Sequence, residues 1–353
     1  MIFPDEDGLR DRYLIFRAPL ADYANRYTLT LGSELCPPEN ASENYGGRWC
    51  ADTLVQGVIS SSALNTRENN MGLQNEKIAA SSFVTADLNY LTPTLERPRN
   101  YTFEPPSGEP RSNIVPEPHG LPIHDLRPIS ETASLDREGF ALVRQKSSVR
   151  DFRDFYDEDE VRNVYYPEAE QLIKAATGAG RVFVFDHTVR KRVEGVADRA
   201  GGLRQPVARV HVDHTANSGP QRVRDLIPDE AEELLKGRVQ IINLWRPIRG
   251  PVLDSPLAVC DARTVKPDDL VASDLVYPNR VGETYAVKYN PEHRWFYVPR
   301  MRVDEVLLLK CFDSKTDGRA RFAPHSAFAD PTTPPDAPPR ESIELRTLVF
   351  HAN

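Results

Sequence analysis

The stretch Ala208-Arg-Val-His-Val-Asp213 alternates apolar and polar residues, which is the pattern of a β-strand with one buried face. Apolar runs of strand length recur along the chain, whereas only two helices are predicted, over 167–177 and 228–236. The predicted strands cover residues 139–144, 181–186, 208–213, 239–245, 257–262, 284–289, 295–298, 306–312 and 342–350. Strands that follow one another through turns favour an antiparallel sandwich or jelly roll over a parallel sheet. We therefore expect a mainly β fold with a few helices.

The composition excludes several classes of protein. The 353 residues carry a formal net charge of −8, and no long Lys/Arg run offers a surface for nucleic acid. The aliphatic runs are far shorter than the roughly 20 residues of a membrane span, and the acidic start does not resemble a signal peptide. Four scattered cysteines do not make a disulfide framework, so we expect an intracellular, cytoplasmic protein.

Proline is the unusual residue of this chain. Nine of the 30 prolines lie between Pro93 and Pro128, and five lie between Pro331 and Pro339. The first group disfavours both helix and central strand, so it predicts an extended arm or wrapping loop over residues 93–128. Residues 1–80 show no sustained periodicity and are interpreted as an N-terminal extension, and residues 81–353 as one domain that includes the arm.

His211 and Asp213 lie two residues apart on a predicted strand, so their side chains point to the same face. With a distant histidine, such a pair makes the 2-His-1-carboxylate facial triad of non-haem Fe(II) oxygenases, which leaves three coordination positions open. The tripeptide Asp-His-Thr occurs at both 186–188 and 213–215, but only the second has a histidine two residues before its aspartate. An isolated pair of this kind is more often structural, so the third ligand decides the hypothesis.

Two histidines further along the chain are candidates for the third ligand. His325 lies just before the last predicted strand, which a jelly roll can fold back beside the strand of His211. His293, between Glu292 and Arg294, is more typical of a histidine that is exposed or that supports a ligand. We therefore predict His211, Asp213 and His325 as metal ligands, and interpret His187 and His214, the histidines of the two Asp-His-Thr tripeptides, as hydrogen-bonded.

The proline-rich link after His325 leads to a possible cosubstrate site on the last strand. Arg340, Ser342 and Arg346 share one face of this strand with Glu344. An arginine there can hold the distal carboxylate of 2-oxoglutarate through two parallel hydrogen bonds, with the Ser342 hydroxyl beside it. Arg340 is the first candidate and Arg346 the alternative, although Arg346 is also interpretable as a paired surface arginine. The predicted cofactors are Fe(II) and 2-oxoglutarate.

At these residues the chain resembles the CmcJ/NvfI family, also described as AsaB-type hydroxylases/desaturases. The resemblance covers roughly residues 83 to 350 and includes Val210-His-Val-Asp213, Asn243-Leu-Trp-Arg-Pro247 and Asp317-Gly-Arg-Ala-Arg-Phe-Ala-Pro-His325. Further similar blocks are 136–144, 184–190, 256–262 and 330–344. The resemblance implies a double-stranded β-helix, a cupin-like jelly roll, that tailors secondary metabolites. It also supports the three proposed metal ligands and, less directly, Arg340.

The leading hypothesis is an oxygenase that uses dioxygen to hydroxylate or desaturate a small molecule, with a ferryl species abstracting hydrogen. Two alternatives stay open: a non-catalytic partner or binding subunit on the same scaffold, and a cupin-like metal enzyme that does not use 2-oxoglutarate. Two features depart from the family: residues 1–80 have no recognised counterpart, and His214 stands where relatives often have a tyrosine-like residue. The sequence also leaves a homo-oligomer open.

Overall fold

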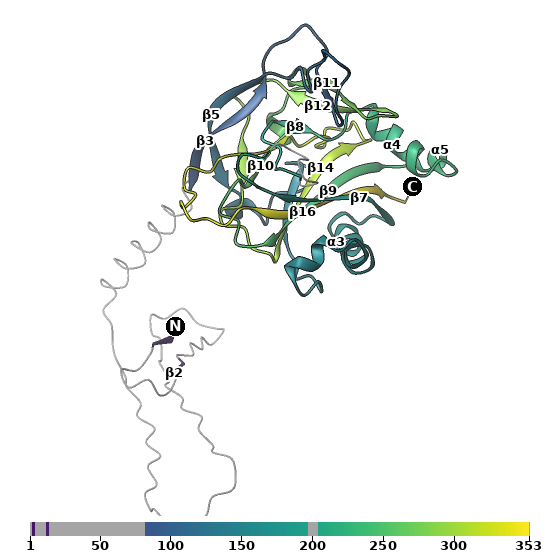
Figure 1. Ribbon diagram of the computed structural model, residues 1–353. Coiled ribbons are helices and arrows are strands. Elements are labelled where there is room, and N and C mark those ends of the chain that lie inside the picture. Colours follow the sequence, from purple (N-terminus) through teal and green to yellow (C-terminus); the bar gives the residue numbers. More distant parts are fainter. Residues whose placement is uncertain (1, 4–11, 14–81, 197–203, 353) are drawn as a thin grey trace, which may run out of the picture. The chain divides into compact units, whose positions relative to one another are not determined.

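The computed structural model describes residues 2–3, 12–13, 82–196 and 204–352 (Figure 1). The chain divides into two units, Met1–Ala80 and Ser81–Asn353. In the first unit, β1 (Ile2–Phe3) pairs antiparallel with β2 (Arg12–Tyr13). The rest of the proposed N-terminal extension lies outside the described residues, so its interpretation stays a prediction.

The second unit is a jelly roll made of two curled β-sheets (Figure 1). The nine-stranded sheet has, in spatial order, β3 (Phe83–Leu91), β5 (Pro116–Asp125), β13 (Trp295–Tyr297), β10 (Leu257–Cys260), β15 (His325–Ala327), β8 (His211–Val212), β12 (Val281–Val287), β11 (Leu270–Val276) and β4 (Arg99–Tyr101). The five-stranded sheet has β6 (Phe140–Arg144), β14 (Glu305–Asp313), β9 (Val239–Arg249), β16 (Glu341–Phe350) and β7 (Arg181–Lys191). Most neighbouring strands are antiparallel, as predicted for a mainly β fold.

The five-stranded sheet is buried on both faces. On its outer face, Ile242 and Leu244 of β9 pack in one hydrophobic cluster with helix α3 (Tyr166–Thr177). On its inner face, Trp245 packs with Leu257 and other residues of the nine-stranded sheet. Because side chains alternate along a strand, the polar residues of β9 and β16 that face inward are held between the two sheets. This arrangement places Asn243 and the even-numbered residues from 342 to 346 in the interior.

The prediction that residues 93–128 form only an arm or loop was wrong for β5, which pairs with β3 along its whole length and with β13 at one end. The Asp125 amide donates to the Ser82 carbonyl on the β3 side. Because successive amides of a strand point to opposite edges, the even-numbered positions point away from β3. Prolines 116, 118 and 122 all occupy even positions, so the absence of their N–H groups removes no hydrogen bond between β5 and β3.

Several other elements differ from their predicted extents. The strand predicted over 208–213 is only β8, His211–Val212, and the helix predicted over 228–236 contracts to α5, Ala231–Leu234. Strands β3 and β11 and helix α4 (Ser218–Leu226) were not predicted. Helix α4 was missed because it has few apolar residues, and its opening Gly219-Pro220 is typical of a turn, although proline is tolerated in a first helical turn.

The remaining helical elements are short. They are the 3₁₀ turns Arg127–Ile129, Phe152–Tyr156, Ala262–Thr264 and Pro267–Asp269, α2 (Glu158–Glu160) and the π turn Val161–Tyr165. Within the described ranges, none of the helices has both the length and the apolar character that a membrane crossing demands.

Candidate metal and cosubstrate site

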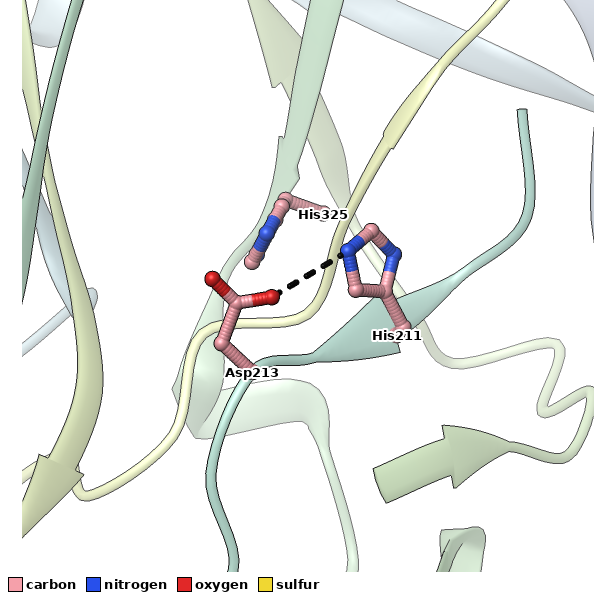
Figure 2. A group of neighbouring side chains, drawn as sticks. All are labelled: His211, Asp213 and His325. Atoms are coloured by element: carbon pink, nitrogen blue, oxygen red, sulfur yellow. Dashed lines mark ion pairs between the residues drawn. The ribbon is translucent and has the colours of Figure 1, made fainter. Parts of the chain in front are cut away.

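The structure brings the three predicted metal ligands together between the sheets (Figure 2). His211 lies in β8, Asp213 directly follows this strand, and His325 opens the neighbouring strand β15. The pairing of the two strands sets His325 opposite His211, with ring centroids 4.4 Å apart. One ligand atom from each residue lies within 4.8 Å of the others. This spacing suits three ligands of a single ion.

Backbone hydrogen bonds orient both imidazoles. Nδ1 of His211 lies 2.8 Å from the Arg209 carbonyl oxygen, and Nδ1 of His325 lies 3.1 Å from that of Ala323. A carbonyl oxygen only accepts, so each Nδ1 carries the proton and each Nε2 keeps its lone pair. Burial and the nearby His211 lower the pKa of His325, which also favours the neutral ring. Both histidines are therefore prepared to bind a metal through Nε2.

The carboxylate of Asp213 is fixed from its far side. Its Oδ2 accepts hydrogen bonds from Asn243 Nδ2 at 2.7 Å and from Arg346 Nε at 3.1 Å. Its Oδ1 lies 3.4 Å from His211 Nε2. Burial alone would raise the pKa of Asp213, but the charge of Arg346 outweighs it and holds this pKa well below its usual range. A carboxylate oxygen thus faces a nitrogen lone pair, an arrangement that a cation between them stabilises.

The predicted cosubstrate residues separate into two environments. Arg346 is paired with carboxylates: besides Asp213, it contacts Asp186 at 3.0 Å and Glu344 at 3.3 Å. Its charge is therefore already compensated, and it supports the Asp213 carboxylate.

Arg340 is 3 % exposed and has only neutral hydrogen-bond partners in the described part of the chain. It donates to the Ser255 carbonyl at 2.6 Å and to Ser342 Oγ at 3.2 Å. The guanidinium lies 5.2 Å from the Trp245 ring centroid. Burial first, and then the neighbouring Arg190, lower the pKa of Arg340 to about 9.

Two cavities meet at the proposed metal ligands. A small one is lined by both histidines together with Arg340, Trp245 and Glu344. A large one of about 1550 Å³ is lined by His211 and Asp213 and extends over helix α4 and the β11–β12 hairpin. Because His211 lines both cavities, a metal ion at these ligands would be reached from two directions.

The other histidines lie outside this group. His293, expected to be exposed or to support a ligand rather than to be one, is buried, with Nε2 3.1 Å from Asp269 and Nδ1 3.0 Å from the Tyr90 hydroxyl. His187 and His214 are hydrogen-bonded, as predicted, to Tyr166 and Ser218 respectively. Asn243 was missed, although an amide within the apolar run of β9 is a usable signal for a buried polar contact.

Comparisons with known proteins identify the family of this chain. A family model described as oxidoreductase/YMDC permease-like domain matches residues 88–350. The hydroxylase/desaturase efuI of Hormonema carpetanum is 39 % identical over 249 residues, which are 65 % of this chain and 82 % of that protein. The Fe(II)/2-oxoglutarate-dependent dioxygenase nvfI of Aspergillus novofumigatus is 35 % identical over 254 residues, or 71 % and 90 % of the two chains. The chain belongs to the family of these hydroxylases/desaturases and Fe(II)/2-oxoglutarate-dependent dioxygenases.

The solved structure of the iron and alpha-ketoglutarate-dependent endoperoxidase NvfI superposes with a TM-score of 0.70 at 32 % identity. The match covers 77 % of this chain and 99 % of that one. The membership confirms the predicted family of hydroxylases/desaturases, the jelly-roll fold and the class of oxidoreductase.

Proposed function

We propose that His211, Asp213 and His325 bind Fe(II) in this chain, and that Arg340 anchors 2-oxoglutarate beside it. The observation that supports this most strongly is the donor set: two neutral imidazoles with Nε2 available and one carboxylate oxygen, all within 4.8 Å. Two histidines and one carboxylate with three remaining positions are typical of non-haem Fe(II) oxygenases. The residues therefore fit the metal that the family uses.

The environment of Arg340 supports 2-oxoglutarate as the cosubstrate. Arg340 lines it together with both histidines, and no carboxylate of the described residues lies within 4.0 Å of the guanidinium. A buried cation without a counterion favours binding of an anion, and a guanidinium binds a carboxylate through two parallel hydrogen bonds. Ser342, which accepts a hydrogen bond from Arg340, holds the guanidinium in place.

Bound Fe(II), with 2-oxoglutarate and dioxygen, supplies the power to abstract hydrogen from an unactivated C–H bond. The chain's own residues set the conditions for this chemistry. Asn243 and Arg346 keep one Asp213 oxygen turned toward the histidines, and the large cavity receives a small-molecule substrate. Hydroxylation and desaturation both follow from such an abstraction. Three expectations from the sequence stay predictions. They are the cytoplasmic location, the lack of nucleic-acid and membrane partners, and the possibility of a homo-oligomer.

The test is iron content and 2-oxoglutarate turnover. After anaerobic reconstitution we expect about one iron per chain, and succinate release that depends on oxygen with a panel of small-molecule natural products. His211→Ala and His325→Ala should lose both. His187→Ala is the matched control, since His187 is hydrogen-bonded to Tyr166 outside the ligand group. Absence of stoichiometric iron would favour a non-catalytic partner or binding subunit. Bound iron without 2-oxoglutarate turnover would favour a cupin-like metal enzyme that does not use 2-oxoglutarate.

A further inference from the structure

The large cavity is strongly basic for an acidic chain. Its lining residues include seven arginines and four carboxylates, whereas the whole chain carries a net charge of −8. Some of these arginines are already compensated. Arg346 contacts three carboxylates, and Arg190 lies 3.6 Å from Glu344. The excess charge therefore resides on other arginines of the cavity wall.

Arg222 and Arg280 are two arginines without such compensation. Arg222 lies on α4, and Arg280 lies between β11 and β12, which is the strand that α4 contacts. Within the part of the chain that the structure describes, neither guanidinium has a carboxylate within 4.0 Å. The nearest acid along the helix, Asp225, instead accepts a hydrogen bond from Gln221 at 2.8 Å.

Each of the two guanidinium groups lies near an aromatic ring in the same cavity. Arg222 is half-buried and lies 5.6 Å from the Phe185 ring centroid, and the exposed Arg280 lies 3.9 Å from that of Tyr277. Such contacts hold a cation in position without neutralising it. Burial, and then the positive charge of Arg280, lower the pKa of Arg222, so the two charges are close enough to repel each other. An anion bound between them would relieve this repulsion.

We propose that Arg222 and Arg280 form a subsite for an anionic group of the substrate, and that the substrate is a small molecule bearing a carboxylate. This inference rests on the proposed function, because it takes the large cavity as the substrate site. The Phe185 ring lies 5.6 Å from the Arg222 guanidinium and 6.4 Å from the His214 imidazole, and His214 directly follows the proposed ligand Asp213. Because the two arginines line the same cavity as the metal ligands without belonging to the ligand group, the carboxylate and the carbon to be oxidised are different parts of the substrate.

A pair of fluorescent probes tests the subsite. 1-Pyrenebutyrate and its primary amide differ only in one terminal group, an anionic carboxylate or a neutral amide, and their binding is measured by fluorescence anisotropy. The protein is kept anaerobic with Fe(II) and saturating 2-oxoglutarate, so that Arg340 is not free to take the probe. We expect the acid to bind about tenfold more tightly than the amide, as for a charge-assisted hydrogen bond. Arg222→Gln and Arg280→Gln should each bring this ratio toward one without weakening the amide.

Arg224→Gln is the matched control, because Arg224 lies on the same helix, is paired with Glu232 at 2.7 Å and does not line the cavity. It removes the same charge and should leave the ratio unchanged. Any of four results would overturn the proposal: equal binding of acid and amide, no binding of either, a ratio that is unchanged in both cavity variants, or an equal loss of the ratio in the control. A failure of the proposed function has a different signature: no visible absorption change when 2-oxoglutarate is added to the Fe(II)-loaded protein, whatever the probe ratio.

Discussion

Replacing Arg340 by glutamine should weaken 2-oxoglutarate binding without destabilising the fold. The guanidinium is buried beside the Trp245 ring, and its partners are the Ser255 carbonyl and the Ser342 hydroxyl. Within the described residues no carboxylate forms an ion pair with the guanidinium, so the guanidinium can pair directly with a bound anion. Removing a buried charge that has no ion-pair partner also relieves a cost in the free protein. We therefore expect the variant to be as stable as the natural chain, or more stable.

The magnitude follows from the burial of the pair that Arg340 would form. Truncating one partner of a buried, hydrogen-bonded charge pair costs about 2–5 kcal/mol, because the other charge is left without a partner. This range corresponds to a rise in Kd for 2-oxoglutarate of roughly 30-fold to several-thousand-fold. Arg340→Lys keeps the charge but loses the two parallel hydrogen bonds, so its Kd should lie between those of the natural chain and Arg340→Gln.

The assay is an anaerobic calorimetric titration of 2-oxoglutarate into Fe(II)-loaded protein, with urea unfolding as the check on stability. Arg249→Gln is a suitable control, because Arg249 is half-exposed and lies 3.4 Å from Glu341 outside the small cavity. Its Kd should match that of the natural chain. An Arg340→Gln variant that binds 2-oxoglutarate normally would refute the assignment of the anchor, as would an equal loss in the control.

Three further outcomes follow from the structure. Asn243→Leu removes a hydrogen bond that fixes the Asp213 carboxylate, so the affinity for iron should fall about 10- to 100-fold in a chelator competition. An unchanged affinity would contradict this role of Asn243. Gly219→Ala should destabilise the fold by about 1–3 kcal/mol in urea unfolding, because the added Cβ would lie 2.5 Å from Phe312 Cγ. Gly180→Ala, where the added Cβ has no neighbour within 4 Å, should leave stability unchanged. Burial lowers the pKa of His293, so below about pH 6.5 the unfolded chain binds a proton there that the folded chain does not. This one residue should therefore add at most about 1.4 kcal/mol per pH unit to the loss of stability as pH falls. An equally steep slope in urea unfolding of His293→Gln would exclude this contribution.

Local patterns predicted the centre of the fold better than its edges. The runs that became β9, β14 and β16 are apolar because both faces of their sheet are buried, and such runs are visible in sequence. Strand β5 could not be found in this way. Its prolines are compatible with pairing only because they all fall on the amides that point away from β3, and this depends on a register set by a strand about 30 residues earlier.

The candidate metal ligands were accessible from sequence for a related reason. A histidine and an aspartate two residues apart need only a short extended segment, and β8 supplies one even though it is just two residues long. The position of His325 depended on topology, because β15 pairs with β8 across 114 residues of chain. Their role as iron ligands stays a prediction until iron is measured.

The choice between Arg340 and Arg346 shows where a local pattern stops being sufficient. Strand alternation correctly predicted that both side chains point inward, Arg346 from β16 and Arg340 from the position directly before this strand, and by that criterion they are equivalent. What distinguishes them is the set of groups that other strands bring to each position. Arg346 meets Asp186 and Asp213, which precede it by 160 and 133 residues, whereas Arg340 meets a carbonyl and a hydroxyl. An arginine's capacity to bind a ligand anion is what remains after the protein's own carboxylates have been counted, and only the folded chain allows that count.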